Sequence, residues 1–275
     1  MRIVTIMLGA ALLLGVAGCG NGQGKNGPAH AKAAAEQTAD APGQAAAESK
    51  AEQAIVSRSV GFGKVNPAPY GRFAEPRQID AFAEAIQSAE QIQGVLDVAQ
   101  PDYDVVLQHD GKRQDIHLWL DTRSEHGMFT YVSDTGTGYR LTTGSTRELM
   151  ELIWGIRYDS KQAAANGDIV NLIGRIENPA TWERFMQNVK SGGSDAVQVV
   201  HYTIEGDPIF DDLSFDGRTI AHRFDNTHDA YGSPAKRLEY CQSIEEMKTE
   251  KGTVYTLAAC GEDGKRSETF QLSIR

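Results

Sequence analysis

The hydrophobic and polar positions divide the chain into three stretches of different character. Residues 3–17 are almost all apolar, residues 20–53 contain no Val, Ile, Leu, Met, Phe, Trp or Tyr, and apolar periodicity begins at Ala54. A stretch without large apolar side chains cannot offset the entropy cost of becoming ordered. We therefore expect a flexible linker over residues 20–53 and a folded region that begins at Ala54.

The first part of the folded region, residues 54–158, mixes strand-like and helix-like patterns. Ile79, Phe82 and Ile86 form one apolar stripe at helical spacing, which predicts a helix over 76–91 with Pro76 at its first position. The capping box Ser145–Glu148 predicts the start of a second helix. The predicted strands are 55–62, 103–108, 116–120, 128–132 and 139–141, with a hairpin turn at Asp110-Gly111 between the second and third.

The second part, residues 159–275, opens in the same way. Residues 159–166 are polar or small and are expected to join the two parts; a strand over 168–176 follows. Asn178 and Pro179 then open a helix with an apolar stripe that includes Trp182 and Phe185. The remaining predicted strands are 197–204, 209–215, 219–224, 237–241, 253–259 and 269–274. The expected fold class is α+β: two small domains, each a mainly antiparallel sheet with one or two packed helices.

The first nineteen residues resemble the signal peptide and lipobox of bacterial lipoproteins. Arg2 precedes the apolar run, which is too short to span a bilayer comfortably and ends in Val16-Ala17-Gly18-Cys19. The resemblance implies cleavage of residues 1–18 and a thioether-linked diacylglycerol on Cys19, so that the mature chain is anchored to membrane lipid outside the cytoplasm. The alternative is an ordinary secretory signal followed by a chance cysteine.

Charge and motifs narrow the classes of function. The chain carries 37 acidic and 27 basic side chains, for a net charge of −10, and both parts of the folded region are acidic. This charge argues against a nucleic-acid partner. No Gly-x-Ser-x-Gly motif is present, and Gly61-Phe62-Gly63-Lys64 lacks the spacing of a phosphate loop. We therefore assign no catalytic residue and no cofactor, and favour a protein that is not an enzyme.

The segment 205–229 holds the strongest candidate for a ligand or metal site. It contains seven acidic residues, opposed by Arg218 and Arg223. Asp225-x-Thr227-x-Asp229 has the alternation of a calcium loop but lacks the glycine and distal glutamate of an EF-hand. The alternative is that these residues occupy turns, which Asp and Asn favour. The candidate site residues are Tyr202, Glu205, Asp207, Asp225, Asp229 and Tyr231.

Cys241 and Cys260 are the only cysteines besides Cys19. Outside the cytoplasm a disulfide between them would persist, and it would stabilise the fold by about 3 kcal/mol in the chain-entropy model. The alternative is two free thiols, in a metal or redox site, although no Cys-x-x-Cys spacing supports it.

Several segments resemble known families. Residues 92–103 and 116–120 resemble the YhfM-like domain of Bacillus-type lipoproteins. Residues 167–171, 202–209 and 225–232, with Cys241 and Cys260, resemble a Firmicute lipoprotein domain of unknown function. The resemblances imply an extracytoplasmic lipoprotein of a Gram-positive bacterium and carry no reaction or ligand with them.

These observations favour a non-catalytic binding or regulatory module, tethered to the outer face of the cell membrane. Its expected partner is an envelope protein or a small ligand, in addition to the lipid that anchors Cys19. The alternatives are a surface hydrolase or metal-dependent enzyme that uses the 205–229 carboxylates, and a purely structural envelope spacer.

Overall fold

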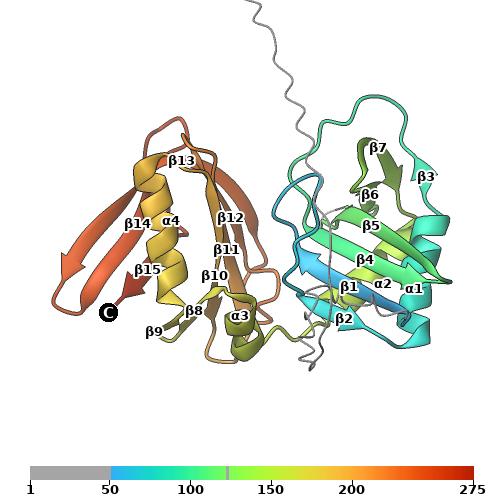
Figure 1. Ribbon diagram of the computed structural model, residues 1–275, viewed down its shortest axis with the longest axis horizontal. Coiled ribbons are helices and arrows are strands. Elements are labelled where there is room, and N and C mark those ends of the chain that lie inside the picture. The colour runs from blue at the N-terminus through green and yellow to red at the C-terminus, as the bar shows by residue number, and fades with distance from the viewer. Residues whose placement is uncertain (1–50, 122–123) are drawn as a thin grey trace, which may run out of the picture. The chain divides into compact units, whose positions relative to one another are not determined.

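The computed structural model describes residues 51–121 and 124–275, which belong to one compact unit (Figure 1). The predicted signal peptide, Cys19 and almost all of the predicted linker lie outside the described residues. Two sheets carry the fold, each with helices packed on it, so the expected α+β class is confirmed. No helix in the described part is long and apolar enough to cross a bilayer.

The first sheet has seven strands in the order β2-β1-β4-β5-β6-β7-β3, all antiparallel to their neighbours. Helices α1 (Pro76–Gln87) and α2 (Thr143–Trp154) accompany it. Asp110 and Gly111 both have positive φ, and they form the predicted turn between β4 and β5. The strands are β1 (Gln53–Arg58), β2 (Gly71–Phe73), β3 (Glu90–Gln91), β4 (Tyr103–His109), β5 (Lys112–Trp119), β6 (Met128–Tyr131) and β7 (Asp134–Arg140).

The ends of both helices differ from the predicted ones. Helix α1 buries Ile79 and Phe82 as expected but ends at Gln87, because Glu90 and Gln91 pair with β7. Helix α2 begins before the predicted capping box. Its N-cap is Thr142, whose hydroxyl accepts a hydrogen bond from the backbone N–H of Ser145 at 3.1 Å. The prediction of Ser145 as the cap is therefore wrong.

The second sheet has eight strands in the order β15-β14-β13-β12-β11-β10-β8-β9. Only the pair β8–β10 is parallel, so the sheet is mainly antiparallel, as predicted. The helices are α3 (Ser160–Asn166) and α4 (Pro179–Ser191). The strands are β8 (Ile169–Leu172), β9 (Arg175–Glu177), β10 (Asp195–Tyr202), β11 (Pro208–Phe215), β12 (Ile220–Asp225), β13 (Lys236–Thr249), β14 (Gly252–Cys260) and β15 (Gln271–Ile274).

Two local predictions in this part are corrected, and a third is confirmed in part. The expected joining segment 159–166 is helix α3, capped by Asp159, whose Oδ1 accepts from the N–H groups of Lys161 and Gln162. The predicted strand 168–176 is a hairpin that turns at Ile173 and Gly174, both at positive φ. Asn178 is the N-cap residue of α4, as predicted, but its side chain makes no cap hydrogen bond; its Nδ2 donates to the backbone carbonyl groups of Ala164 and Asp168.

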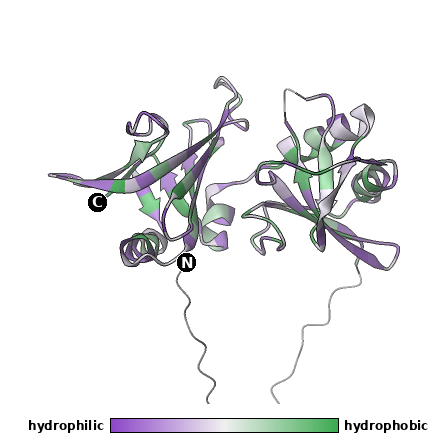
Figure 2. Cartoon of the chain, turned by 90° about the horizontal axis from the view of Figure 1, so that it is seen from above, coloured by the Kyte–Doolittle hydropathy of each residue, from purple (hydrophilic) through white to green (hydrophobic). Residues whose placement is uncertain are grey.

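The two faces of the second sheet have different surroundings. On one face α4 packs Trp182 and Phe185 against a core that includes Val199 and Leu213. The predicted disulfide between Cys241 and Cys260 is present and buried in the same core. Strands of both sheets carry most of the strongly hydrophobic residues, and the loops are mainly hydrophilic (Figure 2). Because side chains alternate across a strand, Gln198 and Asp212 project from the opposite face.

Candidate functional site

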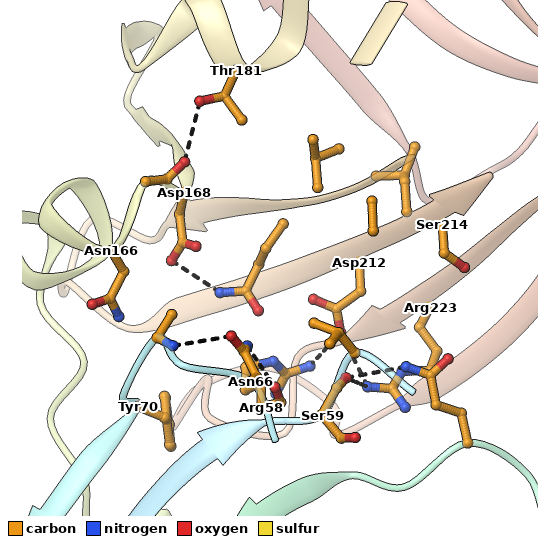
Figure 3. Close-up of a pocket in the computed structure, with 18 of the residues that line it drawn as sticks. Arg58, Ser59, Asn66, Tyr70, Asn166, Asp168, Thr181, Asp212, Ser214 and Arg223 are labelled. Atoms are coloured by element: carbon orange, nitrogen blue, oxygen red, sulfur yellow. Dashed lines mark hydrogen bonds and ion pairs between the residues drawn. The ribbon is translucent and has the colours of Figure 1, made fainter. Parts of the chain in front are cut away.

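A cavity of about 370 Å³ lies against this opposite face of the second sheet (Figure 3). Its size is in the usual range for sites that take a small organic molecule. It is lined by the end of β1 with the loop that follows, the α3–β8 junction, the first turns of α4, and strands β10, β11, β12 and β13, together with Gln100 and Tyr158.

Three small side chains form the floor of the cavity. Ala196 on β10 is paired with Ser214 on β11, and Ser214 is paired with Ala221 on β12. Side chains at paired positions lie on the same face of a sheet, so the three are neighbours at one level of it. Larger side chains at these positions would occupy the space that the cavity now holds open.

Arg58, at the end of β1, supplies the most deeply buried charge at the cavity. Its Nη1 donates to Asp225 Oδ2 and its Nη2 to Asp212 Oδ2, both at 3.0 Å. The guanidinium also lies 4.0 Å from the ring centroid of Phe210, a distance typical of a cation–π contact. Burial alone would raise the pKa of Asp225, but the charges of Arg58 and Lys236 hold it well below its usual range.

Arg223, on β12, completes an ion-pair network with Arg58. Its Nη2 lies 3.3 Å from the same Asp212 Oδ2, and its Nη1 donates to the carbonyl oxygen of Pro101 at 2.7 Å. Both guanidinium groups are therefore already held by protein acceptors. Arg58, Asp212 and Arg223 form a polar row beside the floor, and this row is fixed in place before any ligand enters.

Asp168 is the exception among the charged groups of the cavity. It is 8% exposed, and its Oδ2 accepts hydrogen bonds from the Tyr158 hydroxyl at 2.5 Å and from Gln198 Nε2 at 2.9 Å. Both donors are neutral, and no ion pair among the described residues includes Asp168. Burial raises the pKa of Asp168 to about 6, against the two hydrogen bonds, which act to lower it.

A second polar network lies on the α4 side of the sheet. His222 Nε2 is 2.6 Å from Asp211 Oδ1, and its Nδ1 is 2.8 Å from Glu239 Oε1. Asp211 Oδ2 also lies 3.3 Å from His201 Nε2, and the hydroxyl of Ser267 donates to Glu239. Burial alone would lower the pKa of His222, but the hydrogen bonds and charges of the two carboxylates outweigh it and raise the pKa. The two carboxylates thus favour the charged imidazolium form of His222 within the sheet.

The free energy of unfolding is expected to fall as the pH rises above about 6.5, with a slope of at most about 1.4 kcal/mol per pH unit. A raised folded-state pKa gives His222 stability that is complete below the unfolded value of about 6.5 and is lost as the pH passes the folded value. The shifted pKa values of Asp168, about 6, and His228, about 4, act at lower pH. Urea unfolding at each pH measures the slope.

His222→Gln should remove this slope, whereas His126→Gln, at an exposed histidine, should keep it. An equal slope in the His222→Gln variant and the wild-type protein would show that another group causes it.

The structure does not gather the six predicted site residues at one place. Asp225 pairs with Arg58, and Tyr202 donates its hydroxyl proton to the carbonyl oxygen of Tyr158. Asp207 and Asp229 accept backbone N–H groups in turns: Asp207 from Ala230, and Asp229 from Tyr231 and Gly232. Glu205 is exposed, and the side chain of Tyr231 is 81% exposed. Their role as a ligand or metal site stays a prediction.

Clusters with the spacing of metal ligands occur elsewhere in the described part of the chain. One joins Glu239 to Cys241 and Cys260, whose sulfur atoms are already bonded to each other. The other joins Glu52, His109 and Asp110 and is largely exposed, an arrangement that acidic surfaces often show without an ion.

Sequence reasoning missed the residues that make the cavity, chiefly Arg58, Asp168 and Gln198. One signal was available for Arg58: a charged residue lies within a predicted strand, two positions after the apolar run Ala54–Val56. Such a residue is either at the surface or paired inside the protein. The pattern could not name its partners, because they lie 154 and 167 residues further along the chain.

Comparison with known proteins identifies two domains. No curated protein and no solved structure matches the chain. Residues 50–159 match the family model of the YhfM protein, and residues 166–256 match that of a domain of unknown function, DUF4362. The two matches agree with the resemblances carried by 92–103 and 202–209. The chain therefore consists, over these residues, of a YhfM domain followed by a DUF4362 domain.

Proposed function

We propose that this protein is an extracytoplasmic lipoprotein that binds a small polar ligand in the cavity and does not transform it. The cavity of about 370 Å³, with its fixed polar row and its floor of small side chains, is the observation that carries the proposal. Pockets with a few placed polar groups and an apolar surface are the usual form of small-molecule sites.

The anchor part of the proposal rests on the sequence. Val16–Cys19 has the lipobox pattern, and the linker over 20–53 would give a root-mean-square reach of about 30 Å. The folded region would then stand clear of the lipid headgroups, with access to solutes and neighbours at the outer face of the membrane.

The lining of the cavity favours binding over catalysis. Among the described residues that line it there is no histidine and no cysteine, and its hydroxyl groups include those of Ser214 and Thr181. A serine or threonine nucleophile needs an adjacent base. Its arginines hold protein acceptors instead of standing free to stabilise a developing charge.

A thermal-shift screen of the mature chain tests the proposal. The compounds are amino acids, amines, sugars, short carboxylates and nucleosides at millimolar concentration. At least one class should raise the melting temperature, since a ligand at 100 times its Kd stabilises the folded state by about 2.7 kcal/mol. Ser214→Leu, which fills the floor, should abolish the shift.

The matched control is Ser273→Leu, at an exposed position on β15. It should keep the shift. The proposal fails if no compound raises the melting temperature of the wild-type chain, or if the shift survives in the Ser214→Leu variant.

The metal-dependent alternative stays a prediction for the carboxylates of 205–229. Calorimetry with calcium and with a chelator separates it from the proposal. A melting profile that neither calcium nor the chelator changes would refute the metal-site hypothesis. A calcium-dependent shift that is lost in the Asp229→Asn variant would support it.

A further inference from the structure

We infer that the ligand of the cavity carries a cationic nitrogen group, an ammonium or a guanidinium, that pairs with the carboxylate of Asp168. This inference rests on the proposed binding function and names the chemical class of the ligand. It comes from the charges that surround the cavity and from the shape of its floor.

The charges around the cavity leave Asp168 without a counter-ion. Arg58 and Arg223 form ion pairs with Asp212, and Arg58 also pairs with Asp225. The two guanidinium charges are thus matched by two carboxylates other than Asp168. The remaining arginine in the lining, Arg184, has its own partner in Asp195 at 3.3 Å.

An unpaired carboxylate at a buried position is costly unless it takes a proton or a cation. Its two hydrogen bonds come from the neutral groups of Tyr158 and Gln198, and both end on Oδ2. Among the described residues, no donor is placed on Oδ1. The carboxyl group of Asp168 projects toward the cavity (Figure 3). A ligand N–H group at this place would supply both the missing charge and the missing donor.

The rest of the cavity fits a short apolar body behind such a head group. Its floor is Ala196, Ser214 and Ala221, and its lining also includes the apolar side chains of Val60 and Leu238. Both of these side chains are more than 40% exposed, so the cavity has apolar surface that a ligand can cover. A small alkyl amine or alkyl guanidine matches this combination.

Proton linkage gives the inference a distinctive signature. Because the pKa of Asp168 is about 6, a cation that pairs with the carboxylate displaces a proton below that pH. The affinity for a cation should therefore rise with pH up to about 6 and then level off. An anionic ligand would show the opposite dependence, because it needs the protonated acid.

Isothermal titration calorimetry of the mature chain tests the inference with four probes of similar size: n-butylammonium, n-butylguanidinium, n-butanol and butyrate. At pH 7.5 at least one of the two cations should bind. Its affinity should be about ten-fold weaker at pH 5, as expected for one proton displaced per ligand below the pKa. Butanol and butyrate should bind at least ten-fold more weakly than that cation at pH 7.5.

Asp168→Asn keeps the shape of the side chain and should weaken cation binding at least ten-fold, whereas Asp263→Asn, at an exposed aspartate, should leave it unchanged. Should Asp168→Asn not fold, Tyr158→Phe gives a second readout. It removes a donor that lowers the pKa of Asp168, so the pH midpoint of cation binding should move upward.

The inference is overturned if butanol or butyrate binds as tightly as the cations, if Asp168→Asn folds and binds them with unchanged affinity, or if neither cation binds. Its failure is distinct from that of the proposed function. A neutral or anionic compound that stabilises the wild-type chain but not the Ser214→Leu variant would support the proposed binding function and refute the inference of a cationic ligand. If the whole screen gives no ligand, both fall.

Discussion

Replacement of Arg58 by methionine is expected to lower the free energy of unfolding by about 3–5 kcal/mol at neutral pH. Methionine fills much of the same volume but leaves Asp225 buried without its ion-pair partner. Asp212 keeps Arg223, so the greater part of the loss should come from Asp225. Urea unfolding of the variant and the wild-type protein measures the difference.

The difference should shrink as the pH falls below about 4. The depressed pKa gives Asp225 stability in the wild-type protein above its unfolded value, and this stability is lost as the pH falls toward the folded value. In the Arg58→Met variant, protonation of Asp225 instead stabilises the folded state, because it neutralises a buried carboxylate that has lost its ion-pair partner. Arg140→Met, which breaks an exposed pair with Glu90, should cost less than about 1 kcal/mol. A similarly small loss for Arg58→Met would show that the buried pair contributes little.

Cys19→Ser is expected to abolish incorporation of a fatty-acid label into the protein in cells that produce it. The serine hydroxyl does not take the place of the thiol that forms the thioether with diacylglycerol. The intact mass of the wild-type chain should correspond to residues 19–275 plus lipid, whereas the variant should lack the lipid. Two acyl chains give stable anchoring where one gives only reversible binding, so the effect on membrane attachment should be large.

The chain contains its own control for this experiment. Cys241→Ser removes a cysteine of the disulfide and should leave the fatty-acid label in place. Retention of the label in Cys19→Ser would refute the anchor. An unlabelled wild-type chain that begins beyond the leader would point instead to the ordinary secretory signal.

The features that could be predicted from the sequence are those that local periodicity encodes. The stripe at Ile79 and Phe82 predicted α1, the stripe at Trp182 and Phe185 predicted α4, and the turn at Asp110-Gly111 predicted the β4–β5 hairpin. Each of these depends on residues within a few positions of one another. The disulfide was predictable because the region beyond Cys19 holds just two cysteines.

The wrong local predictions concern segments whose residues are compatible with more than one backbone conformation. Thr142 and Ser145 are both good caps, and the chain uses the earlier one. Residues 159–166 are polar and small, which fits a connection, but Asp159 caps them into α3. Ile173 has positive φ, which is uncommon for a β-branched residue, so the turn between β8 and β9 leaves little trace in the sequence.

The cavity could not be predicted because its members are assembled from distant segments. Ala196, Ser214 and Ala221 are ordinary residues in their own strands, and they form a floor only through the register of three strands. Asp225 was predicted as a ligand residue on account of its acidic neighbours. Its partner Arg58 lies on β1, in the other sheet, where no pattern along the chain connects the two.

The disulfide has a consequence for the alignment of β13 with β14. Cys241 and Cys260 occupy directly paired positions, and beyond them β13 runs outward through mostly exposed polar residues to Thr249. A slip of one residue would exchange the two faces of the strand, but a slip of two would return every side chain to its own face. The alternation of apolar and polar side chains therefore disfavours a slip of one residue but hardly disfavours a slip of two. The covalent bond excludes both, so this hairpin has one alignment in an oxidising compartment and loses that safeguard when reduced.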